Sequence, residues 1–368
     1  MAETYLPLSG LTVVALEQAV AAPFASSRLA DAGARVIKIE RSGGDFARGY
    51  DDVVKGQSSY FVWLNRGKES VAADLTKPED KAMFTELLAG ADVLIQNLKP
   101  GALERLGFDF KHLALKYPKL VVCSISGYGE TGPMADRKAY DLLVQAETGL
   151  CSITGGPEQP SRVGISVVDI ATGATAHAAV LEALIRRGIT GKGSQISISM
   201  FDVLADWLTV PLLQQEGGKP PKRVGLAHPS ISPYGVFTCK DGRQILISIQ
   251  SDREWAKFTA GFMGRPEMGY DPKHATNVAR VENRPATDGA VAEAFAGMTA
   301  DEAIEKLIKV DVAFASVNDM AGLSSHPQLR RITVDTPNGP VSYPAPAPIV
   351  AGDVRSYGGV PAVPVRKA

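Results

Sequence analysis

The chain has 368 residues, of which 45% are hydrophobic and 21% are charged, and its 39 lysines and arginines nearly balance its 40 acidic residues. This is the composition of an ordinary globular protein, and it excludes a disordered, coiled-coil or collagen-like chain. A net charge of -1 gives no general attraction to nucleic acid or anionic lipid, so an anionic ligand would have to be held by a local cluster of cations.

The length predicts two or three domains, and the sequence has no usual signal for export or metal binding. Its three cysteines and five histidines are scattered, which argues against a disulfide framework and a metal site. The first apolar run ends at Glu17 without a preceding basic segment, so no signal peptide is predicted. Because no apolar stretch approaches the roughly 20 residues that cross a bilayer, we expect a cytoplasmic protein without membrane or nucleic-acid partners.

The first forty residues predict a β-α-β unit. An apolar run at Leu11–Leu16 precedes small and apolar residues at helical spacing over Ala21–Ala32, and a second apolar run covers Arg35–Glu40. Continuously apolar strands separated by helices indicate an α/β fold with a parallel sheet covered on both faces. The same alternation continues with a helix at 77–88 and strands at 92–97 and 120–126.

A long helix, a linker and a smaller domain follow along the chain. Residues 174–186 are rich in Ala and Leu and predict a long helix after Asp169. Beyond it, the Asp241-Gly242 pair between two apolar runs predicts a hairpin that opens a smaller α+β domain. The predicted division is a large α/β domain at 1–213, a Gly- and Pro-rich linker at 214–234, the small domain at 235–325, and a return linker with a tail that packs on the large domain at 326–368.

The turn after the first strand lacks the glycines of a dinucleotide site. Glu40 ends the second strand where a ribose-binding acid would stand, but Glu17–Pro23 contains no G-x-G-x-x-G. Without those glycines a pyrophosphate cannot approach the backbone in the usual way. This argues against NAD or FAD binding.

Asp169 is the carboxylate with the most suggestive position. It follows the apolar segment Val163–Val168, where we expect a strand to give way to the long helix. Its side chain could cap the helix by accepting hydrogen bonds from the first free N–H groups. The same donors and the positive helix end would keep the carboxylate ionised and therefore nucleophilic. The residues allow both interpretations.

Two further segments carry groups suited to an anionic ligand. The glycine-rich stretch Gly127–Pro133 follows a predicted strand and leads to Arg137 and Lys138, although a surface loop with solvated charges fits it equally well. Lys99 and Arg105 lie near the end of another predicted strand. Since ligands of such sheets bind at the carboxyl ends of the strands, both segments could face one cleft.

A series of ordered motifs spans the chain. They are Ala34-Arg-Val-Ile-Lys-Ile-Glu40, Gly44-Asp45, Asn65-Arg-Gly-Lys68, Asp74-Leu75, Asn97-x-x-Pro-Gly, Ser126-Gly-Tyr-Gly-x-x-Gly-Pro133 and Thr190-Gly-Lys-Gly-Ser-Gln. Together these motifs resemble the class III CoA transferases, the family that also contains the α-methylacyl-CoA racemases. The resemblance implies a Rossmann-like parallel-sheet large domain with a smaller α+β domain, and a homodimer of interlocked rings.

The resemblance also implies a mechanism and a set of site residues. Asp169 stands at the position of the nucleophile, whose carboxylate attacks an acyl-CoA to give a mixed anhydride and then exchanges through an aspartyl-CoA thioester. The CoA thioester is thus a substrate, and no permanently bound cofactor is implied. The positions that match the family's CoA contacts are Val20, Ala21, Arg41, Leu75, Asn97, Leu98, Arg105 and Lys138.

Two departures from the racemases favour acyl transfer. Tyr140 stands where the racemases have a catalytic histidine, and the stretch Ile249–Asp252 has no glutamate where they have one. A phenol and an amide are poor replacements for a proton-shuttling pair. Racemisation on the same fold and a non-catalytic CoA-binding module remain as alternatives.

The loop His228–Tyr234 resembles the branch of the family that acts on short dicarboxylates, such as succinyl-CoA with mesaconate, itaconate, malate or citramalate. An intramolecular CoA shift also occurs in that branch. Val20 and the lack of a long glycine run argue against formyl-CoA and oxalate chemistry. Tyr50 matches an aromatic position near the active site of the transferases. The candidates for binding a second carboxylate are Arg48, Arg137 and His228.

Overall fold

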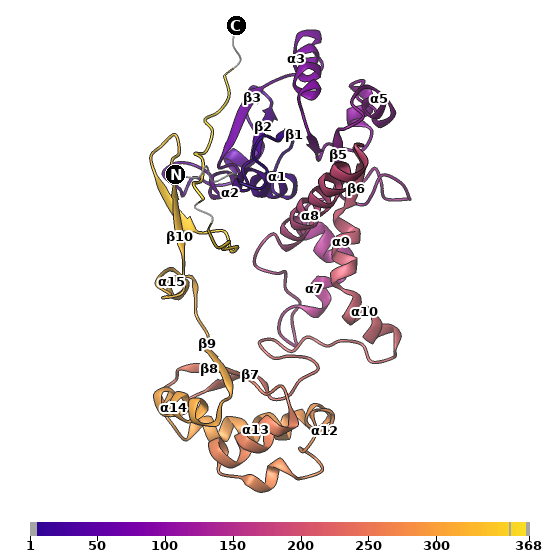
Figure 1. Cartoon of the computed structure of the whole chain (residues 1–368). Coiled ribbons are helices and arrows are strands. Elements are labelled where there is room, and N and C mark those ends of the chain that lie inside the picture. The colour runs from indigo at the N-terminus through magenta and orange to yellow at the C-terminus, as the bar shows by residue number, and fades with distance from the viewer. Residues whose placement is uncertain (1–5, 353–354, 366–368) are drawn as a thin grey trace. The chain divides into compact units, whose positions relative to one another are not determined.

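The computed structural model describes residues 6–352 and 355–365, which fold into two compact units (Figure 1). The first unit takes the chain up to Leu150, residues Arg162–Leu213 and the chain from Arg330 onward. The second takes Cys151–Ser161 and Gln214–Leu329.

The short segment Cys151–Ser161 belongs to the second unit, whereas the sequence placed it in the large domain. Arg223 accounts for the difference, because its guanidinium donates hydrogen bonds to three carbonyl oxygens of this segment. The acceptors are Ser152 at 2.9 Å, Gly156 at 3.1 Å and Pro157 at 3.1 Å.

A six-stranded parallel sheet in the order β3-β2-β1-β4-β5-β6 forms the centre of the first unit, which confirms the predicted α/β class. The four residues of β4 are all buried, as the apolar sequence of a strand covered on both faces requires. The edge strand β3 reads Lys-Glu-Ser-Val-Ala, and this lack of an apolar run explains why the sequence did not predict it. The strands are β1 Thr12–Leu16, β2 Arg35–Glu40, β3 Lys68–Ala72, β4 Val93–Gln96, β5 Val121–Ser126 and β6 Gln195–Ser199.

Helices cover both faces of this sheet (Figure 1). Alternate strand residues point to opposite faces, so Val13 packs with α1 and α8 on one side while Val14 packs with α3, α4 and α5 on the other. The helices of this unit are α1 Ala21–Asp31, the 3-10 helix η1 Phe46–Gly49, α2 Ser59–Leu64, α3 Pro78–Ala89, α4 Ala102–Arg105, α5 Phe110–Lys116, α6 Asp141–Glu147, α8 Val167–Thr190 and α9 Met200–Trp207, with α7 Leu150–Ile153 and α10 Thr209–Glu216 where the chain passes between the units.

The long helix α8 packs closely against α1. A side chain at Gly173 of α8 would lie 2.5 Å from the carbonyl oxygen of Ala21, so only glycine allows this approach. Among the described residues α8 is also the one helix long and apolar enough to cross a membrane, contrary to the expectation that no apolar stretch has that length. In the 18-residue window of α8 that meets this criterion, 39% is buried inside the structure. A single helix of this kind is weak evidence for a membrane span, because the core helix of a globular protein meets the same criterion.

The second unit combines a three-stranded antiparallel sheet, in the order β7-β8-β9, with a helical layer around an aromatic core. Trp255, Phe258 and Phe295 are fully buried in that core. Gly242 has a φ of 81°, which fits the turn predicted between β7 and β8. The elements are β7 Tyr234–Thr238, β8 Gln244–Ser248, α11 Asp252–Phe258, η2 Thr259–Met263, η3 Pro266–Gly269, α12 Asn277–Glu282, α13 Arg284–Ala296, α14 Ala300–Val310, β9 Ala313–Ser316 and α15 Met320–Ser324.

The end of the chain returns to the first unit and contains a hairpin within the predicted extended tail. Its strands β10 Arg331–Val334 and β11 Val341–Pro344 pair antiparallel. Val334 and Val360 pack against Phe61 of α2 in a small hydrophobic cluster.

Candidate active site

A pocket of about 550 Å³ lies in the first unit at the carboxyl ends of the parallel strands. The sheet order reverses between β1 and β4, and in open α/β sheets such a switch point leaves a crevice for a ligand. The segments that follow β1 and β4 contribute to the lining at 18–21 and 97–100, and the carboxyl end of β5 contributes at 125–127.

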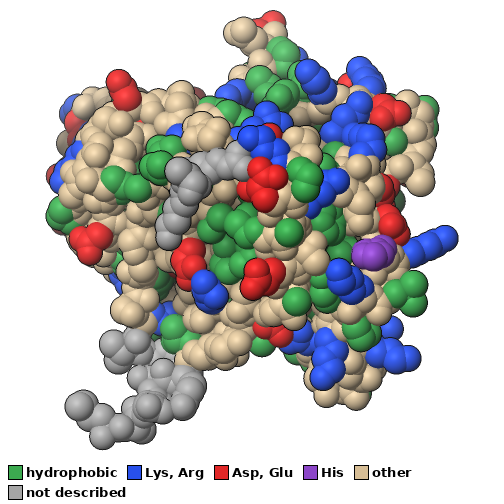
Figure 2. Space-filling model, turned by 90° about the horizontal axis from the view of Figure 1, so that it is seen from above, with side chains coloured by type: hydrophobic (Ala, Val, Ile, Leu, Met, Phe, Trp, Pro, Cys, Tyr) green, Lys and Arg blue, Asp and Glu red, His purple; other side chains and the backbone are tan. Residues whose placement is uncertain are grey.

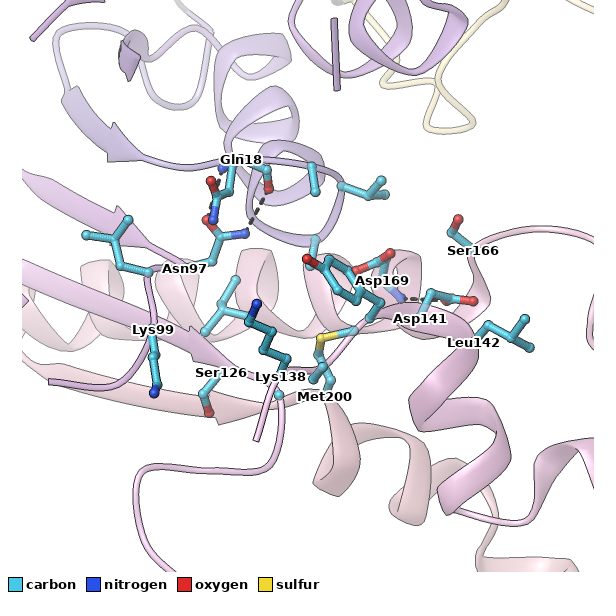
Figure 3. A pocket seen from close by; sticks show the side chains of 18 of the residues that line it. Gln18, Asn97, Lys99, Ser126, Lys138, Asp141, Leu142, Ser166, Asp169 and Met200 are labelled. Atoms are coloured by element: carbon cyan, nitrogen blue, oxygen red, sulfur yellow. Dashed lines mark hydrogen bonds between the residues drawn. The ribbon is translucent and has the colours of Figure 1, made fainter. Parts of the chain in front are cut away.

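Asn97 fixes the turn after β1 from the neighbouring strand (Figure 3). Its Oδ1 accepts a hydrogen bond from the Gln18 backbone N–H at 3.0 Å, and its Nδ2 donates to the Gln18 carbonyl oxygen at 2.8 Å. One amide side chain therefore satisfies both backbone groups of Gln18 and fixes this part of the pocket wall.

Asp169 reaches the pocket from the first turn of α8. The close contact of Gly173 with α1 brings this helix end toward the β1–α1 turn. In the view of Figure 3, Asp169 and Asp141 lie toward one end of the pocket, and Lys99 and Asn97 toward the other.

Asp141, rather than Asp169, caps helix α8. Its Oδ1 accepts the backbone N–H groups of Val168 at 2.8 Å and Asp169 at 3.2 Å, and its Oδ2 accepts from Gln145 Nε2 at 2.6 Å. The sequence allowed Asp169 to be the cap of the helix, its nucleophilic carboxylate, or both. The capping role belongs instead to Asp141, a residue of α6. Among the described residues, no hydrogen bond reaches the carboxylate oxygens of Asp169, which leaves them directed to a ligand.

The pKa of Asp169 is raised from the ordinary 3.8 to about 7. Burial of the carboxylate is the main cause, and the negative charge of Asp141 adds to it. The sequence suggested the opposite direction, because a helix N-terminus favours an ionised carboxylate. Desolvation and a neighbouring acid outweigh the helix end here, so near neutral pH the side chain exchanges readily between its protonated and ionised forms.

Phenol and hydroxyl groups form the wall beside Asp169. The rings of Tyr50 and Tyr60 meet edge to face at 5.5 Å, and the Tyr60 hydroxyl lies 3.3 Å from Ser166 Oγ. Burial, with the nearby charges of Asp45 and Asp169, raises the pKa of Tyr50 to about 12. Its phenol therefore stays protonated and remains a hydrogen-bond donor at neutral pH.

Four cationic side chains line the pocket. Lys99 lies 3.7 Å from Asp136, and Arg137 lies 3.4 Å from Glu147. Within the described part of the chain, the other two, Lys138 and Arg162, have no ion pair with an acidic side chain. Charges of both signs are interspersed on the face shown in Figure 2, so an anionic ligand would depend on these placed cations and not on a basic surface.

The pocket brings together nine of the fourteen residues suggested by the sequence. These are Val20, Ala21, Tyr50, Asn97, Leu98, Arg137, Lys138, Tyr140 and Asp169. The other five are not among its lining residues. Arg41 and Arg105 are exposed on loop and helix ends, and Leu75 is buried in the core.

Arg48 and His228 have other surroundings than the sequence suggested. The Arg48 guanidinium pairs with Glu40 at 2.8 Å and covers the Phe61 ring at 3.6 Å. His228 belongs to the second unit, where its ring stacks on Tyr234 at 5.3 Å.

Several lining residues had not been proposed for the site from the sequence. Met200 follows the carboxyl end of β6, so a rule that collects every strand end would have found it. The same rule would have found Gln18 and Ala19, which follow β1. Others lie on loops and short helices whose approach to the pocket no local pattern reveals, among them Phe46, Tyr60, Arg162 and Ser166.

Residues 6–352 and 355–365 contain no group of three or more His, Cys, Asp or Glu side chains that could hold a metal ion. Of the cysteines, Cys123 and Cys239 are buried free thiols and Cys151 is a half-buried one.

Comparison with known proteins identifies the class. The model of CoA-transferase family III matches residues 8–356. An acetyl-CoA:oxalate CoA-transferase of Acetobacter aceti is 37% identical over 342 residues, covering 92% of this chain and 87% of the relative. A succinate–glutarate CoA-transferase of Agrobacterium fabrum is 38% identical over 288 residues, covering 76% and 72%. A succinyl-CoA:mesaconate CoA-transferase of Haloarcula hispanica is 31% identical over 335 residues, covering 88% and 83%.

A solved structure shows the same architecture. The CAIB/BAIF family protein from Brucella suis is 35% identical, with a TM-score of 0.80 over 96% of this chain and 94% of that one. The sheet, the pocket at its switch point and these relatives define an α/β enzyme of the CoA-transferase class. The chain belongs to CoA-transferase family III, as its motifs indicated, and the relatives named for succinate, glutarate and mesaconate match the short dicarboxylate branch.

Proposed function

We propose that the protein transfers CoA from an acyl-CoA to a short dicarboxylic acid through the carboxylate of Asp169. The supporting observation is the position of this side chain, which is half-buried in the pocket and has no hydrogen-bond partner for its oxygens among the described residues. A carboxylate held this way has lost much of its hydration and is more basic than an ordinary aspartate, and both properties favour nucleophilic attack.

The proposed reaction begins with attack of an Asp169 oxygen on the thioester carbonyl carbon. The carbon–sulfur bond breaks, giving a mixed anhydride and the CoA thiolate. The thiolate then attacks the aspartyl carbonyl carbon of the anhydride, which releases the donor acid and leaves an aspartyl-CoA thioester. The acceptor carboxylate repeats both steps in reverse order, so that acceptor-CoA leaves and the Asp169 carboxylate is restored with no net proton consumed.

Hydrogen-bond donors on the pocket wall suit the oxyanions of these steps. Tyr140 lines the pocket at the start of α6, and Tyr50 keeps its phenolic proton because its pKa is about 12. Donors placed before reaction stabilise a developing oxyanion without reorganisation. Lys99 and Lys138 lie among the lining residues and suit the anionic groups of CoA.

Cations and relatives together support a dicarboxylic substrate. Arg162 and Arg137 line the pocket and are suited to a second carboxylate, since a guanidinium binds carboxylate in a bidentate manner. Relatives are named for glutarate, citramalate and mesaconate. Another relative is named for oxalate. Oxalate is therefore also tested as an acceptor, although Val20 argued against it.

The test is a panel of CoA transfers followed by mass spectrometry of the CoA thioesters. Succinyl-CoA is incubated with glutarate, mesaconate, citramalate or oxalate, and the expected result is a new thioester with at least one acceptor and none with Asp169→Ala. Exchange of the α-proton for solvent deuterium without transfer would favour racemisation. CoA binding without either reaction would favour a binding module.

We further propose the homodimer that the resemblance implies. Trp207, Val210 and Leu213 on α9 and α10 are between 56% and 64% exposed, and a second copy would cover apolar side chains of this kind. Light scattering on the purified chain is expected to give twice the mass of 39.0 kDa, and a monomer at micromolar concentration would contradict the proposal.

A further inference from the structure

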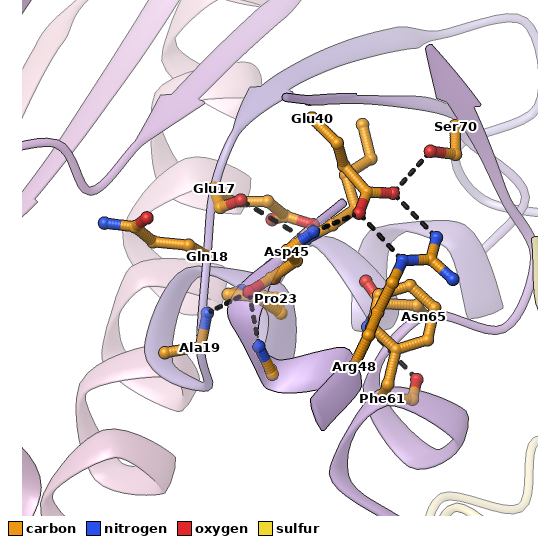
Figure 4. A network of polar contacts seen from close by, with 12 residues as sticks. Glu17, Gln18, Ala19, Pro23, Glu40, Asp45, Arg48, Phe61, Asn65 and Ser70 are labelled. Carbon is orange, nitrogen blue, oxygen red and sulfur yellow. Dashed lines mark hydrogen bonds and ion pairs between the residues drawn. The ribbon is translucent and has the colours of Figure 1, made fainter. Parts of the chain in front are cut away.

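A buried charge network lies beneath the β1–α1 turn, and none of its side chains lines the pocket (Figure 4). It joins residues at the ends of β1 and β2 with residues of η1 and β3. The carboxylates are almost completely buried, and the most exposed cation side chain is only 15% accessible. The members are the carboxylates Glu17, Glu40 and Asp45 and the cations Lys38, Arg48 and Lys68.

Asp45 connects this network to the turn that lines the pocket. Its Oδ1 accepts the backbone N–H of Ala19 at 3.2 Å and that of Ala47 at 2.9 Å. Its Oδ2 accepts from Lys38 Nζ at 2.9 Å, and the same Nζ lies 3.3 Å from the carbonyl oxygen of Glu17. The turn is therefore held from below by Asp45 and Lys38, and from the side by Asn97.

Ala19 adopts a backbone conformation that an alanine avoids. Its φ is 64°, in the left-handed region, where the Cβ atom crowds the backbone. Glycine would adopt this conformation without that penalty. Because Ala19 lies between Gln18 and Val20 and all three line the pocket, the strained peptide is part of the wall of the site.

We infer that Asp45 is a positioning residue for acyl transfer, which acts by holding Ala19 in the left-handed conformation that shapes the pocket wall. The ion pair with Lys38 fixes the Asp45 carboxylate, and the carboxylate fixes the Ala19 peptide. Asp45 therefore acts through the β1–α1 turn and need not touch a substrate. This inference rests on the proposed function, since its effect is read as a change in CoA transfer.

A double-mutant cycle between Asp45 and Ala19 tests the inference. Asp45→Ala is expected to lower kcat/KM for succinyl-CoA on the order of 100-fold, because displacements of about 1 Å in an active site have effects of this size. The kcat/KM of Ala19→Gly alone is measured as the reference for the cycle. In the Asp45→Ala background, Ala19→Gly should restore about tenfold, which is about 1.4 kcal/mol, because glycine no longer needs to be held.

Asp311→Gly is the matched control for this rescue. Asp311 has a φ of 57° at the end of α14 in the second unit, so glycine there relieves the same kind of strain away from the turn. It is expected to raise the unfolding temperature of Asp45→Ala without restoring kcat/KM. Equal rescue by both glycines, or no rescue by Ala19→Gly, would overturn the inference.

Two further arms keep the test decisive. If Asp45→Ala does not fold, the cycle is repeated with Asp45→Ser, whose hydroxyl can still cap η1 at Ala47 but is too short to hold Ala19 as well. Turnover by the wild-type chain tests the proposed function by itself. If no acceptor is turned over, the same tenfold coupling is expected in the Kd of free CoA measured by calorimetry, and its absence there would also overturn the inference.

Discussion

Replacing Asp169 by asparagine is expected to make the protein more stable at alkaline pH. The folded-state pKa of about 7 lies above the ordinary 3.8, so between these values the folded chain binds more protons than the unfolded chain. Stability therefore falls as the pH rises through this window, and the full penalty is present above pH 7. An amide has a similar shape and carries no charge, so Asp169→Asn removes the penalty.

The size of the effect follows from the same values. A pKa of about 7 against 3.8 corresponds to at most about 4 kcal/mol. Because the carboxylate is half-buried and partly solvated through the pocket, we expect a gain of about 1 to 2 kcal/mol at pH 8. At pH 5 most of the folded wild-type side chain is protonated, and the gain should be less than half as large.

Urea unfolding of wild type and Asp169→Asn at pH 5 and pH 8 measures this difference. Asp51→Asn serves as the control with the opposite sign, because hydrogen bonds from Ser59 lower the pKa of Asp51. That variant is expected to lose stability at pH 8. A loss of stability for Asp169→Asn at pH 8, or a gain that does not depend on pH, would refute the reasoning about burial.

Three other predictions concern the same pocket. For the wild-type chain, kcat/KM for succinyl-CoA should rise with pH and level off above about 7. Asp141→Asn should move this rise to lower pH, because the substitution removes a negative charge beside Asp169. An unmoved pH profile would contradict this prediction. Gly173→Ala should lower the free energy of unfolding by about 1 to 3 kcal/mol in urea titrations, because the Cβ of the new alanine would lie 2.5 Å from the carbonyl oxygen of Ala21. Unchanged stability would show that α8 can shift freely. Arg162→Gln should raise KM about tenfold for a dicarboxylic acceptor and leave that for acetate unchanged; equal changes for both acids would exclude a contact with the second carboxylate.

The strands of the central sheet could be predicted because each needs a continuous apolar run to be buried on both faces. The edge strand β3 has no such run, so its sequence does not distinguish it from a loop. An expected strand at Val163–Val168 is instead a loop that leads into the first turn of α8. The capping of that turn by Asp141 joins residues 27 positions apart, and no local pattern reveals such a contact.

The sequence predicts those residues of the site that belong to a recognisable motif or lie at the end of a predicted strand. Asp169, Asn97 and Lys138 were found in this way, and all three line the pocket. The sequence could not give the direction of the Asp169 pKa, because burial and the approach of Asp141 depend on how α6 packs against α8. Tyr60, on the short helix α2, and Arg162, on a loop, escaped notice because no motif or strand end marks them.

The most direct test of the account is the mass of the peptide that contains Asp169 after reaction with an acyl-CoA. The protein is mixed with succinyl-CoA without an acceptor, quenched in acid and digested. A succinyl or CoA adduct on Asp169, lost when free CoA and succinate are added to reverse the reaction, is the predicted result. An unmodified peptide at early reaction times, together with undiminished CoA transfer by Asp169→Ala, would contradict covalent catalysis by this carboxylate.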